Sequence, residues 1–211
     1  FDVVKKCVHE LIADWNKRIK NNNILELHEE MMNLFVEIIF TTVFSEDKNK
    51  KLCDCAKEFG DLFHKLNPIY LLDPHKALKL PFPSINRIKK AKENLDKEIF
   101  KVIDKRLEEK IKHDDILGIM LDAKDEDGKP MSREQLYDEI FTVYMAGTDT
   151  SAKVMTWGFY LLEQNKTEAK PFEKEINELI GKRDIEFADF EKLAYTRLVL
   201  NEAMRMYPPV W

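Results

Sequence analysis

The stretch of sequence that decides the fold reads Ala146, Gly147, Thr148, Asp149, Thr150 and Ser151. It lies in the middle of a long apolar segment that begins with a capping box, in which Ser132 is followed three residues later by Gln135. The helical pattern that starts there runs to about Gln164. Because no charged residue occurs between Glu139 and Asp149, we expect the central turns to be buried on all sides.

The polar element 146–151 is unfavourable inside a helix. Thr, Ser and Asp compete for backbone hydrogen bonds, and Gly has a high backbone entropy cost. Such local misfits concentrate at functional sites, so we expect a local break that frees a carbonyl group, with Gly147 allowing a ligand close to the backbone. Asp149 beside the hydroxyl of Thr150 forms a pair that can relay protons. The alternative is a kinked core helix in which a neighbour or a water molecule satisfies Asp149, and the spacing alone leaves both interpretations open.

A membrane span is a competing interpretation of residues 140–162. Asp149 and Lys153 lie at the centre of that stretch. Each costs about 2.5 to 3.5 kcal/mol at the middle of a bilayer, which argues against a span.

The rest of the chain also shows helical periodicity, with apolar residues at steps of three and four. The expected helices cover residues 3–19, 31–42, 52–66, 84–107 with Ser84 as N-cap, a short segment after Asp114, 171–180 with Pro171 at the first helical position and Gly181 just past the end, and 193–205. No segment shows the alternation of a strand. With only 6 Gly and 8 Pro, the predicted fold class is all-α.

Composition narrows the functional classes. The 211 residues include 34 Lys and Arg against 39 Asp and Glu, a net charge of −5, and 44% hydrophobic residues, enough for a packed core. The acidic balance argues against a nucleic-acid partner. Cys7, Cys53 and Cys55 form no disulfide framework and favour a reducing compartment, so the expected localisation is cytoplasmic.

A second element lies near the end of the sequence, where Glu202 and Arg205 share one helix face and Pro208 and Pro209 follow. An ordinary surface pair at this spacing is far commoner than a functional one and contributes about 0.2 to 0.5 kcal/mol. Because apolar residues surround the pair, we keep it as a candidate for a functional role.

Together the two elements resemble the cytochrome P450 family of heme-thiolate monooxygenases. Residues 146–151 are similar to the polar element of the family's long helix I, and Glu202 to Pro209 resembles its helix K. The segments 13–44 and 114–128 look like helices D and E and the approach to helix I. The resemblance implies that residues 1–211 are a partial cytochrome P450 domain covering roughly helices D to K. We expect the N-terminal sheet region and the C-terminal heme-ligand loop to fall outside these residues.

The resemblance also implies roles for individual residues. Ala146 and Gly147 would line the heme, and Asp149 and Thr150 would be the acid and alcohol that hydrogen-bond dioxygen and deliver protons for O–O cleavage. Glu202 and Arg205 would form a structural pair that anchors the fold near the heme.

The implied cofactor is heme b, whose iron is held by a cysteine thiolate in a loop after helix K. No cysteine here lies in such a loop, so no metal ligand is assigned and the 211-residue chain alone is expected to be inactive. The implied partners are a small apolar organic substrate, dioxygen and a redox partner that supplies electrons. Membrane attachment stays open.

Two alternatives come from other functional classes. The chain could be a non-catalytic helical module, or a decayed remnant, that binds a partner. A helical protein with a di-metal centre is disfavoured because no Glu-x-x-His pair lies in the expected helix cores.

Overall fold

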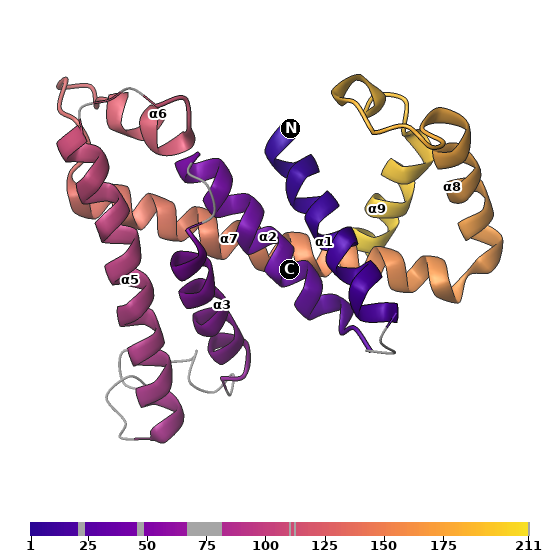
Figure 1. Cartoon of the computed structure of the whole chain (residues 1–211), viewed down its shortest axis with the longest axis horizontal. Coiled ribbons are helices and arrows are strands. Elements are labelled where there is room, and N and C mark those ends of the chain that lie inside the picture. The colour runs from indigo at the N-terminus through magenta and orange to yellow at the C-terminus, as the bar shows by residue number, and fades with distance from the viewer. Residues whose placement is uncertain (21–23, 46–48, 67–81, 110, 112, 211) are drawn as a thin grey trace. The chain divides into compact units, whose positions relative to one another are not determined.

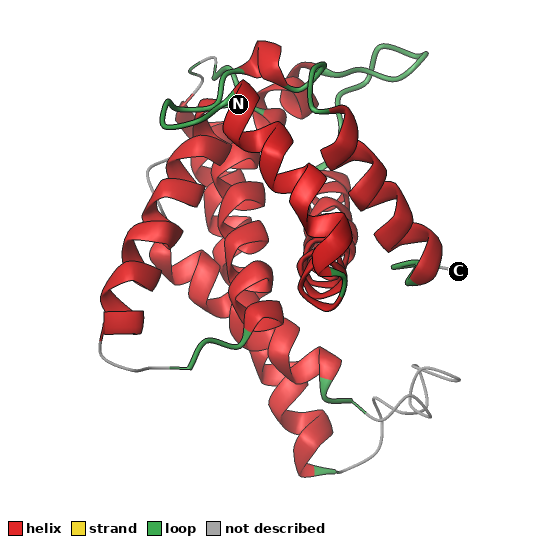
Figure 2. Cartoon of the chain, turned by 90° about the vertical axis from the view of Figure 1, so that its right-hand side faces the viewer, coloured by secondary structure: helices red, strands yellow, loops and turns green. Residues whose placement is uncertain are grey.

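The computed structural model describes residues 1–20, 24–45, 49–66, 82–109, 111 and 113–210. Its elements are α1 (Asp2–Lys20), α2 (Leu27–Phe44), α3 (Lys50–His64), α5 (Pro83–Glu109), α6 (Ile116–Asp122), α7 (Arg133–Gln164), α8 (Lys166–Leu179), the 3-10 turn η2 (Phe187–Asp189) and α9 (Ala194–Met206). These ranges contain no β-strand, only an isolated bridge between Lys124 and Pro130 (Figures 1 and 2). The predicted all-α class is confirmed. Within the described ranges, no helix has the length and apolar character needed to cross a membrane.

The chain divides into two compact units. One comprises residues 1–35 and 146–211, and the other residues 36–145. The helices α2 and α7 are each divided between the two units, at residues 35/36 and 145/146.

In the 36–145 unit, α3 and α5 lie side by side and, with parts of α2 and α7, enclose the core (Figure 1). Its most deeply buried large side chains include Leu52, Leu95, Ile99, Ile103 and Ile140. The hydroxyl of Tyr144 on α7 donates a 2.8 Å hydrogen bond to the carbonyl of Ala56 on α3. This bond satisfies a phenol that is only 2% exposed and fixes α7 against α3.

A buried ion pair fixes α6 in the same unit. Arg106 donates to Asp115 Oδ2 at 2.7 Å and also to the carbonyl of Phe44. The second oxygen of Asp115 accepts from the amide of Gly118 at 2.7 Å and caps α6. A Cβ at position 118 would overlap the carbonyl of His113, so glycine is required there. The short helix predicted after Asp114 is confirmed.

In the other unit, Glu30 joins α1 to α2. Its carboxylate is 7% exposed and accepts from Trp15 Nε1 at 2.8 Å and from Arg18 at 2.6 Å. Both partners come from α1, so this one buried acid holds the two helices together.

The helix α9 is capped by a residue of α8. Leu193 occupies the N-cap position of α9, and its side chain makes no capping hydrogen bond. Glu175 instead accepts from the amides of Tyr195 and Thr196, at 2.6 and 2.8 Å, and from the hydroxyl of Thr196 at 2.8 Å. These contacts satisfy amides that have no partner within the helix.

Two predicted helix starts were wrong. The helix α5 begins at Pro83 rather than after Ser84, because the fixed φ and missing N–H of proline suit a first helical position. The helix α8 begins at Lys166, five residues before Pro171, because the amides of Glu168 and Ala169 bond to the carbonyl of Asn165. Proline then costs the helix a single backbone bond.

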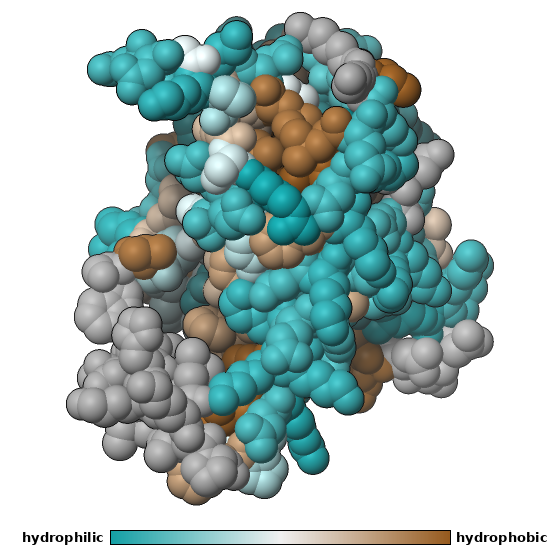
Figure 3. Space-filling model, turned by 90° about the vertical axis from the view of Figure 1, so that its left-hand side faces the viewer, coloured by the Kyte–Doolittle hydropathy of each residue, from teal (hydrophilic) through white to brown (hydrophobic). Residues whose placement is uncertain are grey.

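The predicted end of α8 is confirmed, with Gly181 at φ +61° just past its C-cap. The face of the molecule in Figure 3 is largely hydrophilic, with apolar areas between hydrophilic residues, the clearest of them near the top of the view. This is the pattern of amphipathic helices that bury one face.

Candidate functional site

The helix α7 passes through the polar element 146–151 without a break and has 32 residues. Five of its buried residues recur at every fourth position, namely Leu136, Ile140, Tyr144, Thr148 and Ala152, and Gly158 is buried further along the helix. The predicted break was wrong, and so was the expectation of burial on all sides, because most other positions are half-buried or exposed. The threonine hydroxyls bond within the helix and leave its backbone ladder intact.

Ala146 and Thr150 lie on the open face of α7. They follow Tyr144 and Thr148 by two positions, which is about 200° around the helix and therefore opposite the buried stripe. Ala146 is exposed and Thr150 half-buried. The hydroxyl of Thr150 donates to the carbonyl of Ala146 at 2.7 Å. This open face of small side chains, with Gly147 half-buried next to it, gives a flat ligand access to the helix.

Asp149 is held by a residue that the sequence reasoning did not assign to the site. Its Oδ2 accepts from Lys153 Nζ at 2.6 Å, and the two side chains are 25% and 37% exposed. Its other oxygen, Oδ1, is buried. The spacing of four residues was the available signal, because an acid four positions before a lysine is a favourable helix pair. A neighbour therefore satisfies Asp149, as in the alternative interpretation of a kinked core helix, but α7 has no interruption here.

The acid and the alcohol of the site bond in opposite directions. Asp149 reaches one turn toward the C-terminus of α7, and Thr150 reaches one turn toward its N-terminus. In this conformation each group is held separately, so joint action requires at least one of the two bonds to break.

Glu202 and Arg205 form the pair that their spacing predicted. Both nitrogen–oxygen distances are 2.7 Å, in a bidentate arrangement on the surface of α9. The guanidinium of Arg205 holds the pKa of Glu202 below its usual value. The pair therefore stays charged at neutral pH.

The end of α9 is fixed to α7 by stacked rings. Trp157 and Tyr207 lie face to face, with centroids 3.8 Å apart and planes 7° apart. Tyr160 contacts the edge of Trp157, with centroids 5.5 Å apart. This contact links α9, which carries Glu202 and Arg205, to α7, which carries the polar element 146–151.

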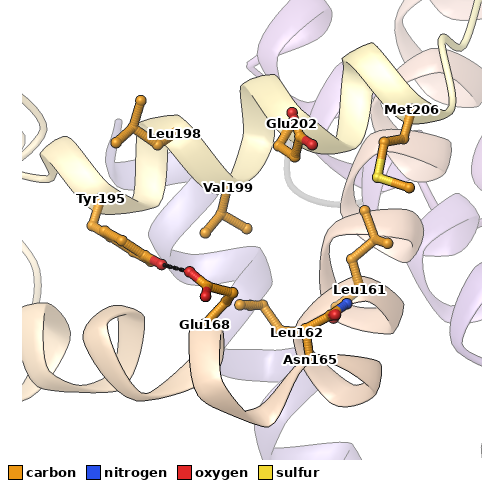
Figure 4. Close-up of a pocket in the computed structure, with 9 residues that line it drawn as sticks. All are labelled: Leu161, Leu162, Asn165, Glu168, Tyr195, Leu198, Val199, Glu202 and Met206. Atoms are coloured by element: carbon orange, nitrogen blue, oxygen red, sulfur yellow. Dashed lines mark hydrogen bonds between the residues drawn. The ribbon is translucent and has the colours of Figure 1, made fainter.

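A groove of about 470 Å³ lies between α7, α8 and α9. Its lining residues are Leu161, Leu162, Asn165, Glu168, Tyr195, Leu198, Val199, Glu202 and Met206 (Figure 4). At one end the hydroxyl of Tyr195 donates to Glu168 at 2.9 Å, and Met206 lies at the other. Sequence reasoning did not predict this groove, because its walls come from three segments that only the fold brings together.

The side chains of this site determine whether it could hold heme. The small residues on the open face of α7 suit the close approach of a flat macrocycle. Across the described part of the chain, no group of three or more His, Cys, Asp or Glu residues could hold a metal ion. Cys7 and Cys53 are buried cysteines, and burial raises the pKa of Cys55.

Comparisons with known proteins give a consistent result. The model of the cytochrome P450 family matches residues 1–211. The chain is 33% identical over 197 residues to cyclooctatin synthase of Streptomyces melanosporofaciens, covering 89% of this chain and 41% of that protein. It is 27% identical to pentalenene oxygenase of Streptomyces avermitilis, covering 92% and 43%.

Solved structures agree with this fold. A cytochrome P450 named CYP102L1 matches with a TM-score of 0.76 and 25% identity, covering 99% of this chain and 49% of that one. A cyanobacterial CYP120A1 with bound retinoic acid matches with a TM-score of 0.79 and 22% identity, covering 97% and 44%. The chain thus spans less than half the length of these relatives. Since the family model matches along the whole sequence, the chain belongs to the cytochrome P450 family.

Proposed function

We propose that the protein is a heme-dependent monooxygenase that activates dioxygen to hydroxylate a small apolar organic substrate. Family membership supports the reaction class. The relative named pentalenene oxygenase supports an oxygenation reaction, and family membership supports an apolar substrate. The observation that carries the proposal is the open face of α7, where Ala146, Gly147 and Thr150 combine small side chains with one hydroxyl group.

Thr150 is the alcohol of this site. While its proton bonds to the carbonyl of Ala146, its oxygen can still accept a hydrogen bond from a ligand on the open face. Rotation about the Cα–Cβ bond breaks the bond to Ala146 and turns the proton outward. One hydroxyl can therefore accept and donate in turn, as a proton relay requires.

Asp149 is the acid of the site. Its ion pair with Lys153 directs the carboxyl group along the helix. When the pair opens, the carboxyl group can take up a proton from solvent and pass it toward Thr150. Positioned general acids of this kind contribute about 10²- to 10⁴-fold to rate.

Heme b is the proposed cofactor, and when bound it supplies the oxidising chemistry at its iron. Ala146 and Gly147 would line its distal face, where small side chains leave room for dioxygen and substrate. Glu202 and Arg205 act as a structural pair on α9. The iron ligand is proposed to be a cysteine outside residues 1–211, and electrons are proposed to come from a redox partner. We further propose a cytoplasmic location.

The role of Thr150 is tested in the heme-loaded, full-length protein by replacing it with Ala. We expect dioxygen consumption to continue while product per dioxygen falls, because the proton relay is lost. Thr150→Ser should retain coupling. Thr142→Ala is the matched control, since Thr142 makes the same 2.7 Å bond to the carbonyl four residues earlier. Unchanged coupling in Thr150→Ala would refute the assigned role.

A second experiment concerns the 211-residue chain itself, which we propose is inactive. We expect its carbon monoxide difference spectrum to lack the Soret band of a thiolate-ligated heme, and the appearance of that band would contradict the proposal. Against a non-catalytic helical module, the discriminating observation is whether the encoded protein includes a heme-ligating cysteine loop after residue 211.

A further inference from the structure

The groove between α7, α8 and α9 has apolar walls that are open to solvent (Figure 4). Five residues of α9 line it at helical steps of three and four, namely Tyr195, Leu198, Val199, Glu202 and Met206. Two of these side chains are strongly exposed, with Leu198 at 61% and Met206 at 46%. An exposed apolar patch on one helix face marks a surface that another element covers.

The groove has the dimensions of a helix-binding site. Tyr195 and Met206 are 11 residues apart on α9, which is about 16 Å or three helical turns. Leu161 and Leu162, in the last turn of α7, form the opposite wall. A space of about 470 Å³ between two helices accommodates apolar side chains of a third helix, spaced three and four residues apart.

The charges along the groove select a cation. No Lys, Arg or His residue is among those that line it. Its two acids differ, because Arg205 neutralises Glu202 at 2.7 Å, whereas Glu168 forms no ion pair with any residue that the structure describes. The side-chain amide of Asn165 donates to the carbonyl of Leu161 at 2.9 Å, which leaves its oxygen as a further acceptor in the groove.

A lysine fits the Glu168 end of the groove better than an arginine. One oxygen of Glu168 already accepts from the hydroxyl of Tyr195 at 2.9 Å. Arginine binds a carboxylate best through both oxygens, whereas the ammonium of lysine is a point charge that needs only one. The ring of Tyr195 can add a cation–π contact.

We propose that a helix from the part of the full-length protein beyond residue 211 fills this groove, with an apolar stripe on α9 and a lysine paired with Glu168. The chain spans less than half the length of the relatives reported above, and proteins of that length have enough further residues to supply such a helix. Met206, at one end of the groove, is five residues before residue 211, so the residues that follow start near this end. The helix and its lysine are independent of the proposed reaction.

The lysine is tested by cross-linking in the unmodified full-length protein. A carbodiimide joins a carboxylate to a lysine that it contacts, and mass spectrometry identifies the joined residues. We expect Glu168 to be joined to a lysine beyond residue 211, and Glu168→Gln to abolish the product while keeping an acceptor for Tyr195. Glu173, exposed on α8, is the control and should not be joined to that lysine. Absence of the Glu168 product would overturn the inference, as would a product with a preceding segment or with a second molecule.

Coverage of the groove is tested separately with Leu198→Cys, which keeps a small apolar side chain at an exposed position. Mass spectrometry measures the alkylation of this thiol in the 211-residue chain and in the full-length protein. We expect alkylation to be about tenfold slower, or more, in the full-length protein, because the thiol reacts only when the added helix opens. Glu173→Cys should react equally fast in both proteins.

Equal rates for Leu198→Cys in the two proteins would also overturn the inference. Slow alkylation in both would do the same, and light scattering that detects a dimer of the 211-residue chain would then assign the groove to a second copy. Neither readout requires turnover, so failure here is distinguishable from failure of the proposed monooxygenase activity.

Discussion

Trp157 of α7 and Tyr207, just beyond α9, stack with their ring planes 7° apart and their centroids separated by 3.8 Å. They lie about two helical turns after Thr150 and two residues after Arg205. The stack therefore holds the C-terminal end of α9 against α7.

The first prediction concerns the energy of this stack. A double-mutant cycle with Trp157→Leu and Tyr207→Leu should give a coupling energy of about 0.5 to 1.5 kcal/mol, the range of aromatic pairs beyond their area burial. Urea unfolding of the 211-residue chain measures it. Tyr207→Phe is the control and should preserve the coupling, because the ring rather than the hydroxyl makes the contact. Additive single effects would show that the stack contributes nothing.

The second prediction is a stabilising substitution at Gly158 in α7. A Cβ there would meet Leu200 Cδ2 at 3.9 Å, an ordinary van der Waals distance, beside an apolar cavity of about 90 Å³. Gly158→Ala should raise the free energy of unfolding by about 0.5 to 1 kcal/mol, because alanine loses less backbone entropy in a helix. Thermal denaturation measures the change.

The control for Gly158 is a glycine in a strained conformation. Gly181 has φ +61°, and a Cβ there would lie 3.3 Å from the carbonyl of Asn177. Gly181→Ala should destabilise the chain by about 1 to 2 kcal/mol. If Gly158→Ala also lowers the melting temperature, the space beside Leu200 is smaller than the structure indicates.

The third prediction is a pH dependence that comes from Glu175. Partial burial acts to raise the pKa of Glu175, but the backbone amides of Tyr195 and Thr196 outweigh it and hold the pKa below its usual value of 4.5. A lowered pKa in the folded state means that the cap stabilises the protein above about pH 4.5. That contribution is lost as the pH falls through the folded value.

The measurement is the free energy of unfolding between pH 7 and pH 3. Glu175→Gln should lower stability at pH 7 by about 0.5 to 2 kcal/mol, as expected for a lost helix cap, and should flatten the decline in acid. Glu173→Gln changes the same charge at an exposed position of α8 and should leave the profile unchanged. Parallel profiles for Glu175→Gln and the unmodified chain would argue against the cap.

The fourth prediction separates the functional from the structural part of the Asp149–Lys153 pair. Because the pair is partly exposed, Lys153→Met should cost less than about 1 kcal/mol of stability. In the heme-loaded protein the same change removes the contact that directs the carboxyl group of Asp149, so kcat should fall about tenfold, part of what a positioned general acid contributes, with little change in KM. Lys153→Arg should recover most of kcat. If Lys153→Met leaves both kcat and the product formed per dioxygen unchanged, the pair only stabilises the helix.

The sequence allowed the long helix and its ends to be predicted because their signals are local. The side chains of Ser132 and Gln135 each bond to the other's backbone amide, at 3.2 and 2.8 Å, as the capping box requires. The left-handed conformation of Gly181 follows in the same way from the chemistry of a single position. Such features depend on neighbours only three or four residues away.

Features that depend on distant segments could not be predicted in this way. The position of Pro171 suggested a helix start, but the amides bonded to Asn165 placed the start earlier. The open face of the site also emerged only when packing selected Tyr144 and Thr148 as the buried side of α7. The sequence indicated candidate residues for the site but not which of them pack inward.

The cap that Glu175 provides has a consequence for how this part of the chain folds. Without an N-cap side chain of its own, α9 has its first amides satisfied only when α8 is already formed and docked. A peptide of residues 193–207 should therefore be largely unstructured, whereas one of residues 165–207 should be helical in both segments. Glu202 and Arg205 lie on α9, so their pair forms only after α8 has formed, in the second half of a helical hairpin.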